Sequence, residues 1–271
     1  MPLWMTETRT SRKKVKIIEN GLTVFMNKEK LFKVLEIYMK NLPLLESNAG
    51  DSKKDMKGIA SYTLLRDIRS LAVANYVLYH DIQTFKSGLC EAALIQRKLF
   101  ERFEKGEPIH SSFVSMLSYR SLFDALAAGD IELAMQLASY MGGRDIIERE
   151  YDNPFTRAFG YTLKNFVLGN QEEMKKWLAD FIARCRRKCN AGFEGYARIF
   201  NGIIKNETGE TEEGFNLLIE GHKRLSKGYG MFKDTADEDL CVWGIGMANL
   251  AHREGLIVKI TSDLIPADLL I

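Results

Sequence analysis

The sequence predicts an all-α protein, and three observations support that prediction. Apolar residues recur with the 3.6-residue period of a helix in nearly every segment, whereas strand-like alternation is weak. Hydrophobic residues make up 46% and charged residues 27% of the chain, which is the balance of an ordinary globular protein. Proline, which interrupts helices, is rare. The 271 residues include only five prolines, at Pro2, Pro43, Pro108, Pro154 and Pro266.

Three amphipathic helices are predicted near the amino end. Apolar side chains form stripes over residues 31–42, 64–78 and 82–103, and each stripe needs a partner to cover it. The polar stretch Ser47–Lys54 separates the first helix from the second, and Asp81 is placed to cap the third. Residues 15–18 and 256–260 alternate weakly and are either short strands or extended chain.

A faint internal repeat runs through the middle of the chain. Gly129, Gly169 and Gly209 are separated by 40 residues each time, and a glutamate follows three positions after each glycine. The first two glycines each end an apolar helical run, so we expect both to adopt a left-handed cap before the next helix begins. The third is less regular, because a polar loop over residues 205–210 surrounds it.

This repeat predicts antiparallel helix hairpins stacked as a helical-repeat array of the tetratricopeptide kind, or as a bundle. The alternative is an ordinary helical bundle in which three evenly spaced glycines are a coincidence. We expect one all-helical domain over residues 1–271, with the repeat-like hairpins in residues 111–230. The packing of the amino-terminal segment, residues 1–50, is left open at this point.

Charge and hydropathy argue against several classes of partner and location. The net charge of +2 indicates no strong attraction to nucleic acid or to a membrane surface. No segment has the roughly 20 consecutive apolar residues that span a bilayer, and the first ten residues lack the apolar core of a secretory signal. Four scattered cysteines predict no disulfide framework. We therefore expect a cytoplasmic protein.

No motif of a reaction centre is present, so we predict neither an enzyme nor a bound cofactor. A phosphate-binding glycine-rich loop, a nucleophile elbow and a triad-like histidine pattern are all missing from the sequence. Cys185 and Cys189 have the spacing of a two-ligand metal clamp, but we interpret both as core residues that continue a buried stripe. The basic run at 184–188 is interpreted as a solvated helix end rather than a phosphate site.

Two acidic groups were compared with the paired carboxylate clusters that hold magnesium in helical terpenoid synthases. The first group comprises Asp234, Asp237, Glu238 and Asp239. The second comprises Glu207, Glu210, Glu212 and Glu213. The second group falls on a predicted repeat turn rather than on a cavity-facing helix, so no metal site is predicted. Residues 237–239 are interpreted as the cap and acidic first turn of the last helix.

The carboxyl end and one central phrase resemble a known family. A helix from Leu240 to Ala251 stops at Gly255, and the extended residues 256–260 and the ending Asp-Leu-Ile-Pro-Ala-Asp-Leu-Leu at 263–270 follow. The central phrase comprises Ala125, Leu126, Gly129, Asp130, Ala134, Leu137 and Ala138. Together they resemble the immunity protein 49 family of bacterial polymorphic-toxin systems, over roughly the second half of the chain.

The resemblance implies a non-enzymatic antitoxin that binds a cognate effector toxin in the cytoplasm and occludes its functional site. Charged turns at the edge of such an interface set its specificity, so both acidic groups are our candidates for partner binding. The alternative is a tetratricopeptide-like adaptor or regulatory protein whose concave face binds a peptide or helix of a partner. Neither hypothesis calls for nucleic acid, a membrane or a metal.

Overall fold

The computed structural model describes residues 22–271, and this part of the chain is all-α, as predicted. Eleven α-helices and six short 3-10 helices form within these residues, without a β-strand. The helices are α1 Leu22–Ala49, α2 Ile59–Tyr79, α3 Ile82–Glu104, α4 Tyr119–Ala128, α5 Ile131–Tyr140, α6 Asp145–Tyr151, α7 Pro154–Val167, α8 Gln171–Cys185, α9 Glu194–Lys205, α10 Thr208–Leu225 and α11 Val242–Arg253. Residues 256–260 are extended chain rather than a strand, and residues 15–18 lie outside the described part.

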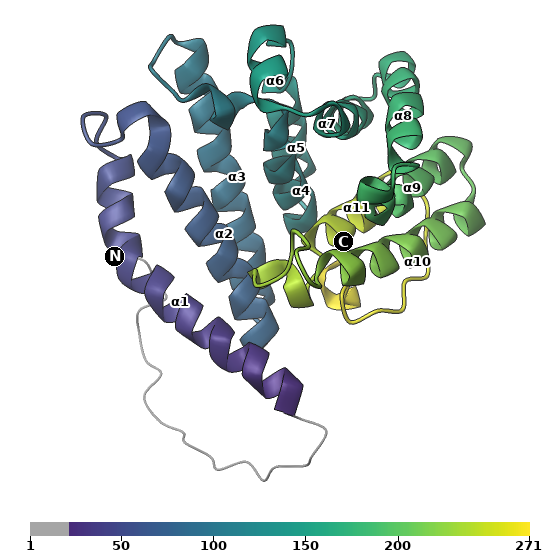
Figure 1. The fold of residues 1–271 in the computed structure, drawn as a ribbon, viewed down its shortest axis with the longest axis horizontal. Helices are drawn as coiled ribbons and strands as arrows, with labels where there is room; N and C mark the ends of the chain where they lie inside the picture. The colour runs from purple at the N-terminus through teal and green to yellow at the C-terminus, as the bar shows by residue number, and fades with distance from the viewer. Residues whose placement is uncertain (1–21) are drawn as a thin grey trace.

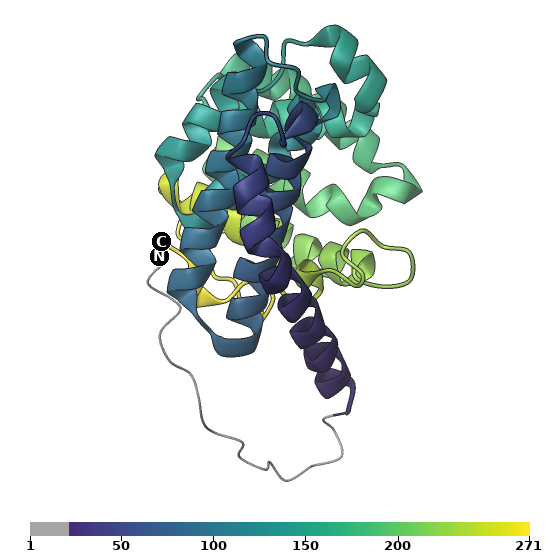
Figure 2. The ribbon, with the colours of Figure 1, turned by 90° about the vertical axis from the view of Figure 1, so that its left-hand side faces the viewer.

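The first three helices follow the predicted stripes. Asp81 caps α3 as expected, because its carboxylate accepts hydrogen bonds from the Thr84 backbone nitrogen at 3.0 Å and the Thr84 hydroxyl at 2.6 Å. The first helix is longer than the pattern suggested, since α1 continues through Pro43 to Ala49. The predicted linker Ser47–Lys54 is therefore helical in its first residues. Along α1, Leu35 and Leu42 are buried, and α1 packs against α2 on one side of the molecule (Figure 2).

Antiparallel neighbours dominate the rest of the fold. The pairs α2–α3, α4–α5, α7–α8 and α9–α10 each pack against one another, and they follow one another around an arc (Figure 1). Helix α11 returns to the inside of this arc, where it contacts α4, α9 and α10. On α11, Trp243 stacks on Phe123 of α4 with ring centroids 5.3 Å apart, so the last helix is part of the core.

The repeat phrase is correct at two of its three glycines. Gly129 and Gly169 have φ angles of +84° and +72°, which is the left-handed conformation predicted for a helix end. Gly209, for which no such cap was predicted, lies in the first turn of α10. Asn206 occupies the left-handed cap of α9 instead, with φ of +55°. Asparagine tolerates this conformation better than most residues, so the turn does not need the glycine.

Glycines do have a second role at the α9–α10 contact. A β-carbon at Gly195 would lie 2.2 Å from the Leu218 backbone nitrogen, and one at Gly214 would lie 2.8 Å from the Ile199 backbone nitrogen. The two helix backbones therefore approach more closely than any side chain at these positions allows. This close contact fixes the orientation of α10 and therefore the position at which the following segment begins.

We predict that Gly195→Ala lowers the free energy of unfolding by at least about 2 kcal/mol, because the added methyl group meets backbone atoms that cannot move aside. Gly209→Ala is the matched control, since no atom lies within 4 Å of the added carbon and its φ is not positive. That variant should gain about 0.5 kcal/mol from helix propensity. Urea unfolding followed by circular dichroism measures both, and equal effects at the two positions would contradict the account.

Candidate functional site

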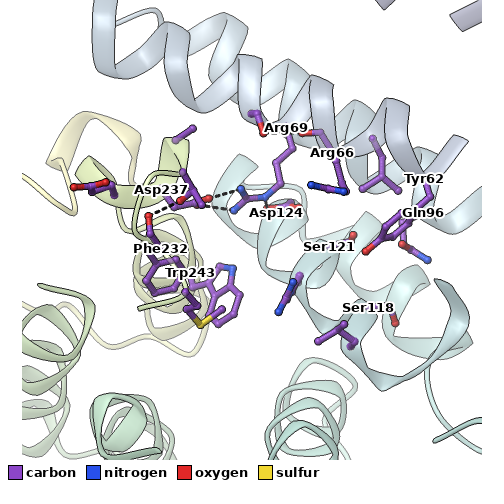
Figure 3. Close-up of a pocket in the computed structure, with 18 of the residues that line it drawn as sticks. Tyr62, Arg66, Arg69, Gln96, Ser118, Ser121, Asp124, Phe232, Asp237 and Trp243 are labelled. Carbon is purple, nitrogen blue, oxygen red and sulfur yellow. Dashed lines mark hydrogen bonds and ion pairs between the residues drawn. The ribbon is translucent and has the colours of Figure 1, made fainter. Parts of the chain in front are cut away.

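A cleft of about 450 Å³ lies between α1, α2, α4 and the segment 231–239 (Figure 3), and Leu31 and Tyr38 are its α1 residues. We call it the Arg69 cleft. Tyr62, Arg66 and Arg69 of α2 line one side, together with residues 117–124 around the start of α4. Residues 231–239 line the opposite side, and Trp243 of α11 completes it. Its volume lies within the range of about 300–1,000 Å³ that is typical of ligand sites.

Arg69 joins the two sides of the cleft. Its Nε donates to Oδ1 of Asp124 at 2.8 Å, and its two terminal nitrogens donate to the carboxylate of Asp237 at 2.6 and 2.7 Å. The fork of the guanidinium matches a carboxylate in this bidentate arrangement, which fixes both distance and angle. Figure 3 shows Arg69 and Asp237 pointing toward each other. Helix α2 is thereby connected to α4 and to the segment that follows α10.

Burial makes the charges of this cluster costly unless they are paired. Burial alone lowers the pKa of Arg69, but the attraction of Asp124 and Asp237 outweighs it and raises the pKa overall, so the guanidinium stays charged. Burial raises the pKa of Asp124 to about 6, although Arg69 acts in the opposite direction. Near neutral pH the cluster therefore holds one cation between two carboxylates.

The segment 231–239 is also held in place by α10 and by contacts within the segment itself. His222 of α10 donates from Nε2 to the Asp237 carbonyl at 2.9 Å, and its ring stacks on Phe232 with centroids 4.5 Å apart. Glu238 accepts from Lys233 at 2.8 Å and from the Asp234 backbone nitrogen at 2.7 Å. The acidic wall of the cleft is consequently a folded turn with defined contacts.

Two arginines on the opposite wall differ from Arg69. Arg66 of α2 and Arg120 of α4 line the cleft and are exposed. Neither forms a close salt bridge, with nitrogen and oxygen within 4.0 Å, to a carboxylate in the described part of the chain. Both still attract carboxylates at longer range, because Arg66 opposes the burial that raises the pKa of Asp67, and Arg120 acts in the same way on the pKa of Asp124. These two guanidinium groups remain available to a ligand.

The structure brings the first predicted acidic group to the cleft. Asp234, Asp237, Glu238 and Asp239 all line its loop wall. The interpretation of residues 237–239 as the cap and first turn of the last helix is wrong, because α11 begins at Val242 with Cys241 at the cap position, and residues 236–239 form a separate 3-10 helix. The bidentate contact with Arg69 holds Asp237 in that separate turn.

The second acidic group lies at the other end of α10. The 18 residues of α10 correspond to about 27 Å at 1.5 Å per residue, so the two groups do not form one patch. Glu207 precedes α10 as its cap residue, and Glu213 pairs with Arg198. Glu210 pairs with Lys205, and Glu212 accepts from the Lys259 backbone nitrogen at 2.8 Å. Most of this group therefore holds the α9–α10 turn and the carboxyl-terminal segment in place.

The interpretation of the cysteine pair is only half correct, whereas that of the basic run at 184–188 agrees with the structure. Cys185 is buried as predicted, but Cys189 is exposed, because α8 ends at Cys185 and the stripe does not continue. Arg184 pairs with Asp180 within the last turns of α8, which is consistent with a solvated helix end. No three histidine, cysteine or carboxylate side chains in the described part of the chain come together as a metal site.

Sequence reasoning missed the residues that define the cleft. Arg69 and Asp124 lie inside apolar helical runs, and a charged residue within such a run was the available signal. Arg66 and Arg120 gave no such signal, because exposed arginines occur on most helices. Only the tertiary arrangement places all four around one cavity.

Comparison of the chain with protein-family models, with curated proteins and with solved structures finds no match. None of the helices within residues 22–271 combines the length and apolarity that crossing a bilayer requires.

We predict that Arg69→Met lowers the free energy of unfolding by about 3–5 kcal/mol, because it leaves two buried carboxylates without their cation. Arg66→Met is the matched control on the same helix, and its exposed position predicts a change within about 0.5 kcal/mol. Urea unfolding at pH 7 measures both variants. A loss below about 1 kcal/mol for Arg69→Met would show that the buried cluster does not hold the two sides together.

The histidine predicts a pH effect. Burial lowers the pKa of His222 from its ordinary value of 6.5, although Asp237 opposes the shift, so the folded state keeps the ring neutral. Its contribution to stability is present above pH 6.5 and is lost as the pH falls through the lower folded pKa. Wild-type protein should therefore lose more stability between pH 7 and pH 5 than His222→Gln.

Urea unfolding at the two pH values measures this difference, with His252→Gln as the control at an exposed position. The control should keep the wild-type dependence on pH. Asp124 has the opposite effect on stability as the pH falls, because its pKa is raised to about 6. It is present in the wild type and in both variants, so its effect cancels in the comparison. Identical slopes for wild type and His222→Gln would rule out a neutral buried histidine.

Proposed function

We propose that this protein is an immunity-type antitoxin, which binds a cognate bacterial effector toxin and uses the Arg69 cleft as the centre of the contact. The resemblance of the second half to the immunity protein 49 family supplies the class of partner. We place the contact at the cleft because two exposed arginines, Arg66 and Arg120, line it and form no close salt bridge with another described residue.

The architecture of the cleft suits a binding surface. Arg69, His222 and Lys233 each hold part of its walls before any partner arrives. A preformed surface binds more tightly than one that must be ordered, because less conformational entropy is lost. The cleft alone is smaller than a stable interface, which buries about 1,600 Å² in total, so its rim contributes too. The predicted residues Asp234, Glu238 and Asp239 are part of that rim.

A peptide-binding adaptor is the second candidate. The successive antiparallel pairs α7–α8 and α9–α10 favour it, because helix hairpins in series form the extended surfaces of tetratricopeptide-like proteins. The two candidates differ in their partner. An antitoxin binds one toxin tightly and protects cells from it, whereas an adaptor binds segments of cellular proteins and protects against none.

The test uses the effector encoded immediately upstream of this chain's own gene, expressed inducibly in bacteria with and without the protein. We expect the wild-type chain to restore growth and to form a one-to-one complex. The variant Arg66→Glu with Arg120→Glu should reduce survival at least about tenfold, because reversing two interface charges costs several kcal/mol.

The matched control is Arg186→Glu with Arg187→Glu, which reverses two exposed charges that do not line the cleft. It should protect cells as well as the wild type does. Absence of an upstream secreted effector, or expression without rescue and without a complex, would contradict the antitoxin proposal.

A further inference from the structure

The charges of the Arg69 cleft divide into engaged and available groups. On the loop wall, Asp237 binds Arg69, and Glu238 binds Lys233 at 2.8 Å. The other two carboxylates there, Asp234 and Asp239, are not without partners either. Every acidic group of this wall is thus already engaged.

The helix wall is different. Arg69 carries one positive charge against the two carboxylates that it binds, so the buried cluster has a net charge of −1 when all three groups are ionised. Arg66 and Arg120 supply two positive charges beside it, and neither has a close salt bridge with another described residue. Asp67 and Asp124 attract these two arginines at longer range, but both guanidinium groups are exposed, so a ligand can reach them.

Apolar surface surrounds these two arginines. Tyr62 is half-buried, lines the cleft (Figure 3) and stacks on Phe113 with ring centroids 4.1 Å apart. Leu65 and Leu117 line the same region, and Phe232 and Trp243 line the far side. A ligand with a carboxylate between apolar groups matches both features, because guanidinium groups bind carboxylates while aromatic and aliphatic walls bury the rest.

We propose that the cleft takes an aspartate or glutamate side chain of the partner protein, flanked by apolar residues, with the carboxylate on Arg66 and Arg120. This inference rests on the proposed function, because the carboxylate comes from the partner protein that the proposed function names. A buried acidic anchor of this kind fits the general pattern of interfaces, in which a few central side chains carry most of the affinity.

The test titrates the full chain with two blocked tripeptides, acetyl-Leu-Glu-Leu-amide and acetyl-Leu-Gln-Leu-amide, which differ only in the carboxylate. Nitrogen-15 spectra of the arginine Nε–Hε groups report binding at individual arginines, and Arg66→Lys and Arg120→Lys identify their signals. We expect the glutamate peptide to shift the signals of these two arginines and to bind at least about tenfold more tightly, because hydrogen bonds between ionised groups are strong.

Variants make the expectation specific. Arg66→Ser with Arg120→Ser should reduce the affinity for the glutamate peptide to that for the glutamine peptide, whereas Arg186→Ser, outside the cleft, should not change it. Circular dichroism checks that each variant is folded. Equal affinities for the two peptides, no binding of either, or equal shifts at all exposed arginines would overturn the proposal.

Benzoate is titrated in parallel as a free aromatic acid. If it binds through the same arginines and more tightly than the glutamate peptide, the cleft is a small-molecule site and the proposed occupant is wrong. Failure of this inference is distinguishable from failure of the antitoxin proposal. Rescue of cells that is insensitive to Arg66 and Arg120 overturns only the inference, whereas arginine-dependent peptide binding without rescue overturns only the antitoxin proposal.

Discussion

The contact of Arg69 with Asp124 and Asp237 is the constraint on which the cleft depends. These residues are 55 and 168 positions from Arg69, so one buried guanidinium joins α2 to α4 and to the turn beyond α10 (Figure 3). Such clusters contribute little net stability, because desolvation offsets most of their attraction. What they specify is geometry, since a bidentate pair tolerates little movement. Here the geometry they specify is the separation of the two walls of the cleft.

The rest of the architecture supports that separation. The glycine contact between α9 and α10 fixes the path of α10, and His222 near its end holds the carbonyl of Asp237. Trp243 packs α11 against Phe123 of α4, one residue before Asp124. Side-chain packing, the close backbone contact and hydrogen bonding therefore all help to position the turn that contains Asp237. The exposed arginines of the helix wall therefore lie in a cleft whose walls do not have to rearrange when a ligand binds.

The parts of this arrangement that local physics determines were predictable from the sequence. Helix periodicity gives the all-α class, and short-range geometry gives the cap at Asp81 and the left-handed turns at Gly129 and Gly169. The left-handed turn at Asn206 was not predicted, because no local signal ranked it above the neighbouring polar residues. Prediction failed at Asp237 for a different reason: an acidic residue before a helix reads as a cap, and the sequence does not reveal an arginine 168 positions away. Half of the acidic candidates line the cleft, whereas its two exposed arginines, Arg66 and Arg120, had no sequence signal that distinguished them.

The account holds that the protein works by contact and that the contact is centred on the Arg69 cleft. Backbone hydrogen exchange, measured for the chain alone and in complex with the effector that the proposal predicts, tests this most directly, because it maps the contact without any substitution. The predicted result is slower exchange concentrated in residues 62–70, 117–124 and 231–239. Protection confined to residues 184–189 or 207–213, with the walls of the cleft unchanged, would contradict the account.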